Sequence, residues 1–215
     1  MFKLEQLFEG CYLVVAPTTQ DLAKLFLRFQ EHYESPNKEF RDRAFSLEEF
    51  RAWYTHKFGK EGQFSYYEDW GGFNIPGYIL EKFYDGKFTD IQLDERWLLE
   101  QFRFMDLSQI YIIGVSEDNG REALEHEKSH ALFYLNYSYR FRVNVLNMRW
   151  KKKLTPIRLY LRKKGYCEKV LIDETNAWLC FDDEVLIEAG LDLDDLRPLQ
   201  RTLRRMYQRF MGEVK

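Results

Sequence analysis

An H-E-x-x-H pentad at residues 126–130 constrains this chain more than any other feature of its sequence. Residues 123–135 around it have the composition and spacing of a helix. On an α-helix, side chains four residues apart lie on one face, so His126 and His130 could hold one metal ion between them. Glu127 lies at the flank of that face, where it could hold a metal-bound water without being a ligand itself. The pentad therefore predicts a zinc site on a helix.

The composition is that of a folded, globular protein. With 215 residues the chain can bury one substantial core, and its 45% hydrophobic and 17% aromatic residues exclude a disordered chain. The formal net charge of -3 gives no overall field that would attract nucleic acid. An odd number of cysteines without a C-x-x-C pair is a poor disulfide framework, so we expect Cys11, Cys167 and Cys180 to be small buried residues.

The sequence gives no sign of export or of membrane insertion. Its first residues have no apolar signal-peptide region, and the apolar run at 12–16 is too short to span a bilayer. We therefore expect a reduced, cytoplasmic protein without a membrane association. No internal repeat or linker divides it, which predicts a single domain over residues 1–215, with residues 1–105 as an alternative N-terminal subdomain that covers a cleft.

Hydrophobic spacing and turn signals predict a helix-rich α+β fold with a small mixed or antiparallel sheet. Strands are expected at 11–16 and 110–115. The aromatic segment 64–70 is expected to be extended, and the glycine-rich segment 71–77 to be a turn or loop. A capping box at residue 46 predicts the start of one helix. Further helices are expected at about 19–32, 78–83, 94–104, 121–137, 141–152, 156–164 and 194–211.

The third zinc ligand does not follow from the pentad alone. Catalytic zinc usually takes three protein ligands and leaves a fourth position to water. The extended motif that adds a third histidine after a glycine is absent, because Phe133 occupies the glycine position and no histidine follows His130. A downstream ligand must therefore be a carboxylate or a cysteine.

Over about residues 110–180 the sequence resembles the gluzincin class of HExxH zinc metallopeptidases, in which a glutamate on a later helix completes the site. Segment 172–179, an acidic pair followed by the small Ala177, is similar to that later helix. The resemblance implies Glu174 as the third ligand and Asp173 as the side chain that fixes the tautomer of one histidine. The other downstream glutamates that stay open as ligands are Glu168, Glu184 and Glu188.

Two positions depart from the pattern of that class. Lys128 is charged where the pattern prefers an uncharged residue, although position 128 points away from the histidine face. Trp178 stands four residues after Glu174, where some members carry an aspartate that supports a ligand histidine. The orientation of that histidine is then left to Asp173 or to a backbone carbonyl.

The resemblance implies a zincin-like domain and a zinc-dependent hydrolase, with a metallopeptidase as the favoured interpretation. A zinc-bound water activated by Glu127 would cleave a peptide bond in a peptide or protein substrate. Tyr134 or Tyr137 could stabilise the oxyanion. The strand at 110–115 would be the edge strand that binds an extended substrate by β-augmentation.

Two other classes of function stay open at this point. One is a noncatalytic zincin-like binding or regulatory protein. The other is an anion- or nucleic-acid-binding module that uses the basic run at 149–164, although no nucleic-acid partner is expected. A simpler explanation of the run is a solvated helix face opposite inward Leu159 and Leu161, paired with the acidic segment 182–195.

Overall fold

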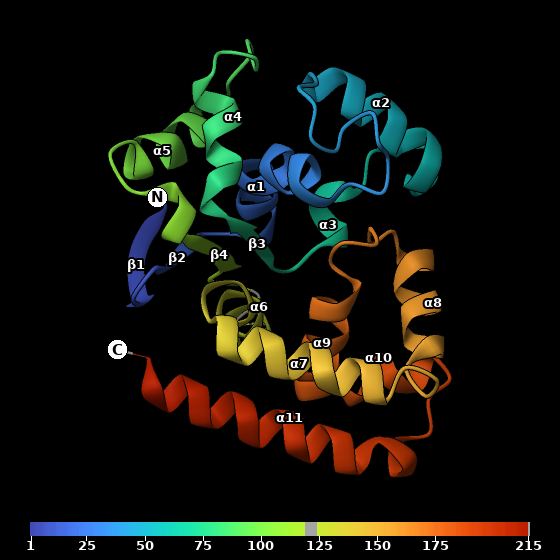
Figure 1. The fold of residues 1–215 in the computed structure, drawn as a ribbon. Helices are drawn as coiled ribbons and strands as arrows, with labels where there is room; N and C mark the ends of the chain where they lie inside the picture. Colours follow the sequence, from blue (N-terminus) through green and yellow to red (C-terminus); the bar gives the residue numbers. More distant parts are fainter. Residues whose placement is uncertain (119–123, 215) are drawn as a thin grey trace. The chain divides into compact units, whose positions relative to one another are not determined.

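A computed structural model gives the fold of the chain and describes residues 1–118 and 124–214 (Figure 1). The fold is α+β, 60% helical with a small mixed sheet of four strands, as the sequence predicts. The chain divides into two compact units, Met1–Ala123 and Leu124–Lys215. This division does not decide the prediction of a single domain, because two compact units can belong to one domain.

The first unit holds the sheet and a set of helices around it. Its strands are β1 (Lys3–Phe8), β2 (Cys11–Ala16), β3 (Phe73–Pro76) and β4 (Tyr111–Ser116). Its α-helices are α1 (Thr19–Glu34), α2 (Leu47–Phe58), α3 (Tyr66–Asp69), α4 (Glu81–Tyr84) and α5 (Leu93–Phe102), with short 3₁₀ helices η1 (Gly77–Leu80) and η2 (Leu107–Gln109).

Strand β4 lies inside the sheet, whose strand order is β1-β2-β4-β3. It pairs with β2 in parallel and with β3 in antiparallel register, and all six of its residues are buried. The expectation of an edge strand at 110–115 is therefore wrong. Both sides of β4 already carry backbone hydrogen bonds, so this strand cannot bind an extended peptide by β-augmentation.

Two further expectations for the first unit are wrong. The segment 64–70 is not extended but contains α3, because Asp69 accepts hydrogen bonds from Ser65 and Tyr54 and so favours a helical turn over a strand. The segment 71–77 is not all loop, since β3 follows the two glycines and is completely buried. Pro76 ends this strand, which lies at an edge of the sheet, where proline is tolerated.

Helix α1 packs against β4 at Gly114. A Cβ atom at this position would lie 2.5 Å from Cε2 of Phe26 and 2.9 Å from Cδ1 of Leu22, closer than side chains approach one another. Only glycine allows the helix and the strand this separation.

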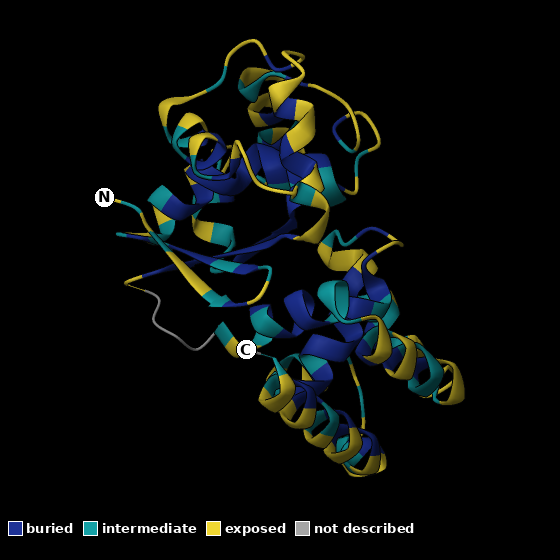
Figure 2. Ribbon diagram, turned by 60° about the vertical axis from the view of Figure 1, so that its left-hand side comes forward, coloured by how far each residue is buried: buried dark blue, intermediate teal, exposed yellow. Residues whose placement is uncertain are grey.

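The second unit is entirely helical in its described part. Its helices are α6 (Leu124–Leu135), α7 (Tyr137–Arg149), α8 (Thr155–Lys164), α9 (Leu171–Phe181), α10 (Asp183–Glu188) and α11 (Leu193–Glu213). Helix α9 contacts all five of the others and is buried over most of its length. Buried residues gather inside each unit, and exposed residues lie along the outer sides of the helices (Figure 2).

The ends of these helices follow from local sequence signals. Pro156 stands in the first turn of α8, and Gly165 ends that helix with a φ of 106°, as predicted. The helix that carries the pentad ends at Leu135 rather than at residue 137, because the side chain of Asn136 accepts a hydrogen bond from the backbone N–H of Tyr139 and begins α7. The predicted start of the pentad helix at 121 lies outside the described residues.

The basic run at 149–164 is not a single solvated face opposite two inward leucines. Leu161 is buried, but Leu159 is 51% exposed, so the expectation for Leu159 is wrong. Within the acidic segment, Asp195 pairs with Lys153 at 2.7 Å between exposed side chains. Such surface pairs contribute little to stability.

Among the described helices, none combines the length and the apolar character that crossing a bilayer requires.

Helix α1 buries the carboxyl group of Glu31, and burial raises its pKa to about 7, although hydrogen bonds from Ser35 and Tyr66 act in the opposite direction. Its Oε2 atom is buried and makes no hydrogen bond to the described residues. The folded state therefore favours the protonated form of this side chain.

We predict that Gly114→Ala lowers the free energy of unfolding by about 1–3 kcal/mol, because the added methyl group forces α1 away from β4. Gly212→Ala is the control, since a Cβ at residue 212 meets nothing within 4 Å. Denaturant unfolding measures both. Equal stability of Gly114→Ala and the wild type would contradict this account of the α1–β4 packing.

Glu31 also predicts a dependence of stability on pH. Because the folded state holds this proton more tightly than the unfolded chain, the stabilisation is complete below pH ~4.5 and is lost as the pH rises through ~7, on the order of 3 kcal/mol. Glu31→Gln should therefore be more stable than the wild type above pH 7, with the difference shrinking at lower pH. The exposed Glu39→Gln serves as the control. Parallel pH profiles of wild type and Glu31→Gln would refute the assignment.

Candidate metal centre

Helix α6 brings the two histidines of the pentad together. Their positions one turn apart place the imidazole rings with centroids 4.9 Å from each other. His130 is completely buried and the side chain of His126 is only 13% exposed. Helix α6 thus presents both rings to the interior of the second unit.

Helix α9 supplies two carboxylates from its first turn, Asp173 and Glu174, both buried. The positive end of a helix dipole favours negative charge at this position. Helix α9 packs directly against α6, and Ala177, one turn beyond Glu174, is completely buried. Burial of Ala177 is compatible with the expected close approach of these two helices.

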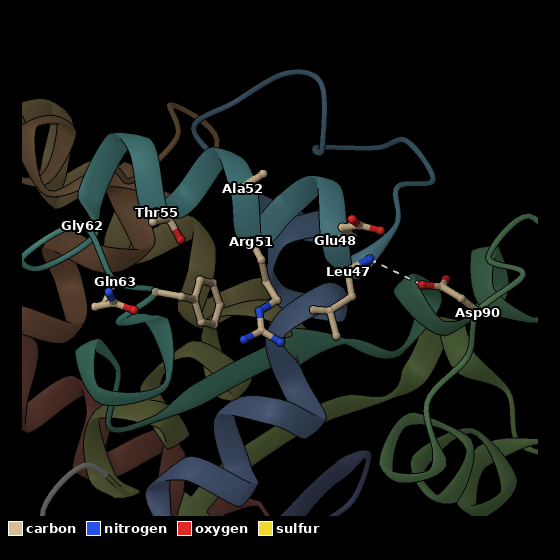
Figure 3. A pocket seen from close by; sticks show the side chains of 9 residues that line it. Leu47, Glu48, Arg51, Ala52, Thr55, Gly62, Gln63 and Asp90 are labelled. Carbon is tan, nitrogen blue, oxygen red and sulfur yellow. Dashed lines mark hydrogen bonds between the residues drawn. The ribbon is translucent and has the colours of Figure 1, made fainter.

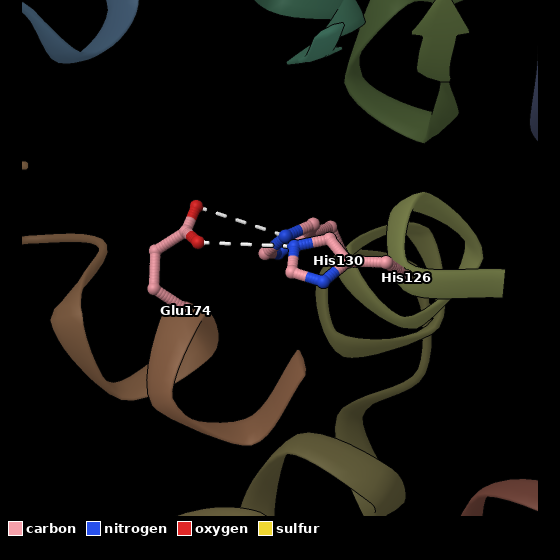
Figure 4. A group of neighbouring side chains, drawn as sticks. All are labelled: His126, His130 and Glu174. Atoms are coloured by element: carbon pink, nitrogen blue, oxygen red, sulfur yellow. Dashed lines mark ion pairs between the residues drawn. The ribbon is translucent and has the colours of Figure 1, made fainter. Parts of the chain in front are cut away.

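The carboxylate of Glu174 points toward both imidazoles (Figure 4). Its Oε1 atom lies 3.6 Å from Nε2 of His130, and its Oε2 atom lies 3.9 Å from Nε2 of His126. One ligand atom from each of the three side chains lies within 4.8 Å of the other two. This arrangement brings together the three ligands that the sequence predicts.

The spacing and the chemistry of these atoms fit a zinc ion. Two tetrahedral ligands at about 2.0–2.1 Å from zinc are separated by about 3.4 Å, so a small contraction of the cluster would close the site. The Nε2 atom of His130 is buried and makes no hydrogen bond to the described residues. Buried polar atoms normally have a partner, and a cation between the imidazoles and Glu174 would supply one.

Asp173 contacts the opposite side of the His130 ring. Its Oδ2 atom lies 2.9 Å from Nδ1 of His130. A carboxylate at Nδ1 favours the proton on that nitrogen, which leaves Nε2 to face Glu174 and a metal ion. The position of Asp173 is thus compatible with its predicted role, in which it fixes the tautomer of one histidine.

The buried ionisable groups shift one another's protonation. Burial lowers the pKa of His126 well below its ordinary value, and the nearby His130 lowers it further. Burial would also lower the pKa of His130, but Asp173 and Glu174, and to a smaller extent Glu127, raise it well above its ordinary value. His126 is therefore neutral near pH 7, whereas a cation would take the place of the proton on His130.

The remaining predicted site residues lie at different places relative to the cluster. Glu127 is buried on α6 next to His126, close enough for its charge to act on His130. Tyr134 is half-buried one turn beyond His130 on α6. Tyr137 begins α7, is 70% exposed and stacks with Phe141, so the structure does not bring it to the histidines.

The alternative glutamate ligands lie elsewhere. Glu168 is exposed and pairs with Arg162, and Glu188 is exposed and accepts a hydrogen bond from Tyr160. Glu184 is exposed on α10. Glu174 is thus the downstream glutamate that reaches the two histidines.

Trp178 is a contact of this cluster that the sequence analysis did not assign. Its indole Nε1–H donates a hydrogen bond of 3.1 Å to Oε2 of Glu174, and its ring centroid lies 4.6 Å from that of His126. The signal was present in the spacing, since residues four apart on a helix are neighbours.

A hollow lies in the first unit, between α2 and the residues that face it (Figure 3). The guanidinium group of Arg51 lies 4.9 Å from the ring centroid of Phe64 there. Glu48 and Asp90 add charge of the opposite sign to the same lining. Because positively and negatively charged side chains line this open groove together, its charge does not indicate which kind of ligand it would bind.

No protein-family model, no curated protein and no solved structure matches this chain. The resemblance to gluzincins therefore stays an expectation from the pentad and segment 172–179.

We predict that the purified protein binds about one zinc ion per chain and that His126→Ala or Glu174→Ala removes it, because the site then loses one of its three ligands. His56→Ala, at an exposed histidine of α2, should keep the metal. Metal analysis after dialysis measures the zinc content of each variant.

Zinc should also raise the free energy of unfolding by about 2.7 kcal/mol when its concentration is a hundredfold above the dissociation constant. Full zinc content in Glu174→Ala would speak against this ligand set.

Proposed function

We propose that this protein is a zinc-dependent hydrolase, and that it acts as a metallopeptidase of the gluzincin type on a peptide or protein substrate. The convergence of His126, His130 and Glu174 from two helices is the observation that supports the proposal most strongly. The pentad supplies Glu127 in addition, the residue that distinguishes a hydrolytic site from a purely structural one.

Zinc bound by these three side chains would supply a Lewis acid that polarises a carbonyl group and acidifies a water molecule. Glu127 is the general base that accepts the proton of the attacking water and returns it to the leaving amine. Its neighbour in sequence is the candidate ligand His126, and its buried position keeps bulk water away from the carboxylate. Such a setting strengthens the electrostatic interactions of the proton-transfer step.

Asp173 has a positioning role in this proposal. Its carboxylate at Nδ1 of His130 holds the imidazole so that Nε2 is directed at the metal position. Tyr134 is the candidate for oxyanion stabilisation, because it follows His130 by one turn on α6 and is half-buried. Tyr137 has no such role in this proposal, since its exposed ring stacks with Phe141 on α7.

A reduced, cytoplasmic setting suits this proposal. Cys11, Cys167 and Cys180 are all buried, and none of them forms a disulfide within the described residues. Free thiols are the ordinary state of cysteine in that compartment.

We predict that Glu127→Gln abolishes peptide hydrolysis while zinc binding is unchanged. The amide keeps the shape of the side chain but cannot accept the proton, so the rate should fall by about 10²–10⁴-fold. Glu125→Gln is a matched control on the same helix, because Glu125 pairs with Lys128 and accepts a hydrogen bond from Tyr207 rather than contacting the histidines.

Cleavage of a mixture of unstructured peptides, followed by mass spectrometry, measures the activity. A wild type that binds zinc but cleaves no peptide would favour the noncatalytic binding role. Undiminished cleavage by Glu127→Gln would exclude the mechanism.

A further inference from the structure

We infer that Trp178 is a positioning residue of the metal centre, which holds Glu174 in the orientation that zinc requires. The inference rests on the proposed zinc site and concerns a residue to which the pentad assigns no role. Trp178 lies one turn beyond Glu174 on α9, so both side chains project from the same face of that helix.

The two carboxylate oxygens of Glu174 have different neighbours. Oε2 accepts the hydrogen bond from Nε1 of Trp178 at 3.1 Å. Oε1 is the oxygen nearer to His130, at 3.6 Å from Nε2. A charge-assisted hydrogen bond to a carboxylate fixes its rotamer, so the N–H group of Trp178 directs Oε1 toward the metal position.

The same ring also contacts the other side of the site. Its centroid lies 4.6 Å from that of His126, with the two planes at 67°. This edge-to-face contact restricts the rotation of an imidazole whose side chain is otherwise the most exposed of the three ligands. One indole thus touches two of the three ligands, Glu174 through its N–H group and His126 through its ring.

Where Asp173 orients His130 from the side of Nδ1, Trp178 orients Glu174 and His126. Each of the three ligands then has a neighbour on α9 that limits its movement. Removing such a neighbour typically lowers metal affinity by about 10–100-fold without removing a ligand.

The test is the zinc affinity of Trp178→Phe, measured by competition with a chelator of known affinity. Phenylalanine keeps an aromatic ring near His126 but lacks the N–H group, so we expect zinc to bind about 10–100-fold more weakly. Trp150→Phe is the matched control, because Trp150 ends α7 and its ring faces Lys153 rather than a ligand. Wild-type affinity in Trp178→Phe would overturn the inference and leave the proposed metal site intact.

A second measurement uses the zinc-free protein and does not require the variant Trp178→Phe to fold. In the zinc-free protein, the indole N–H resonance of Trp178 should move upfield in Glu174→Gln, because a neutral amide is the weaker acceptor. The resonance of Trp150 should not move. An unchanged Trp178 resonance would overturn the inference. A wild type that binds no zinc would overturn both this inference and the proposed function. If the wild type binds zinc and Trp178→Phe binds it equally well, only the inference about Trp178 is overturned.

Discussion

Helices α6 and α9 bury several ionisable side chains between them. Glu127, Asp173 and Glu174 are buried carboxylates, and they share the interior with the completely buried His130. Removing an ion from water costs several kcal/mol even in a relaxed protein, unless opposite charge and hydrogen bonds compensate. A proton on His130 compensates in part, and a divalent cation would do so more completely. The metal ion that we propose between the two helices would therefore compensate for the burial of these acidic and imidazole groups.

The same constraint accounts for the arrangement of α9 within the unit. Because α9 is surrounded by the other five helices, its first turn brings Asp173 and Glu174 into the interior rather than to the surface. The completely buried Ala177 suits the direct packing of α9 against α6, which holds the carboxylates beside the histidines. The geometry of the site is thus a property of two packed helices, which hold functional groups more rigidly than loops do.

The sequence predicted the parts of this protein that local spacing governs. The pentad helix, the capping box at Ser46 and the end of α8 at Gly165 all follow from interactions within a few residues. Strand partners do not, since β4 pairs with strands far from it in sequence, and its interior position was missed. Glu174 was found only through a family resemblance. The spacing of four residues predicts that Trp178 is a neighbour of Glu174, whereas the hydrogen bond between them is seen only in the three-dimensional structure.

X-ray absorption spectroscopy of the zinc-loaded protein would measure the ligand shell of the bound metal. We expect two imidazole nitrogens and further light oxygen ligands at about 2.0–2.2 Å. A sulfur ligand at about 2.3 Å, or a shell without imidazole scattering, would assign zinc to residues other than His126, His130 and Glu174.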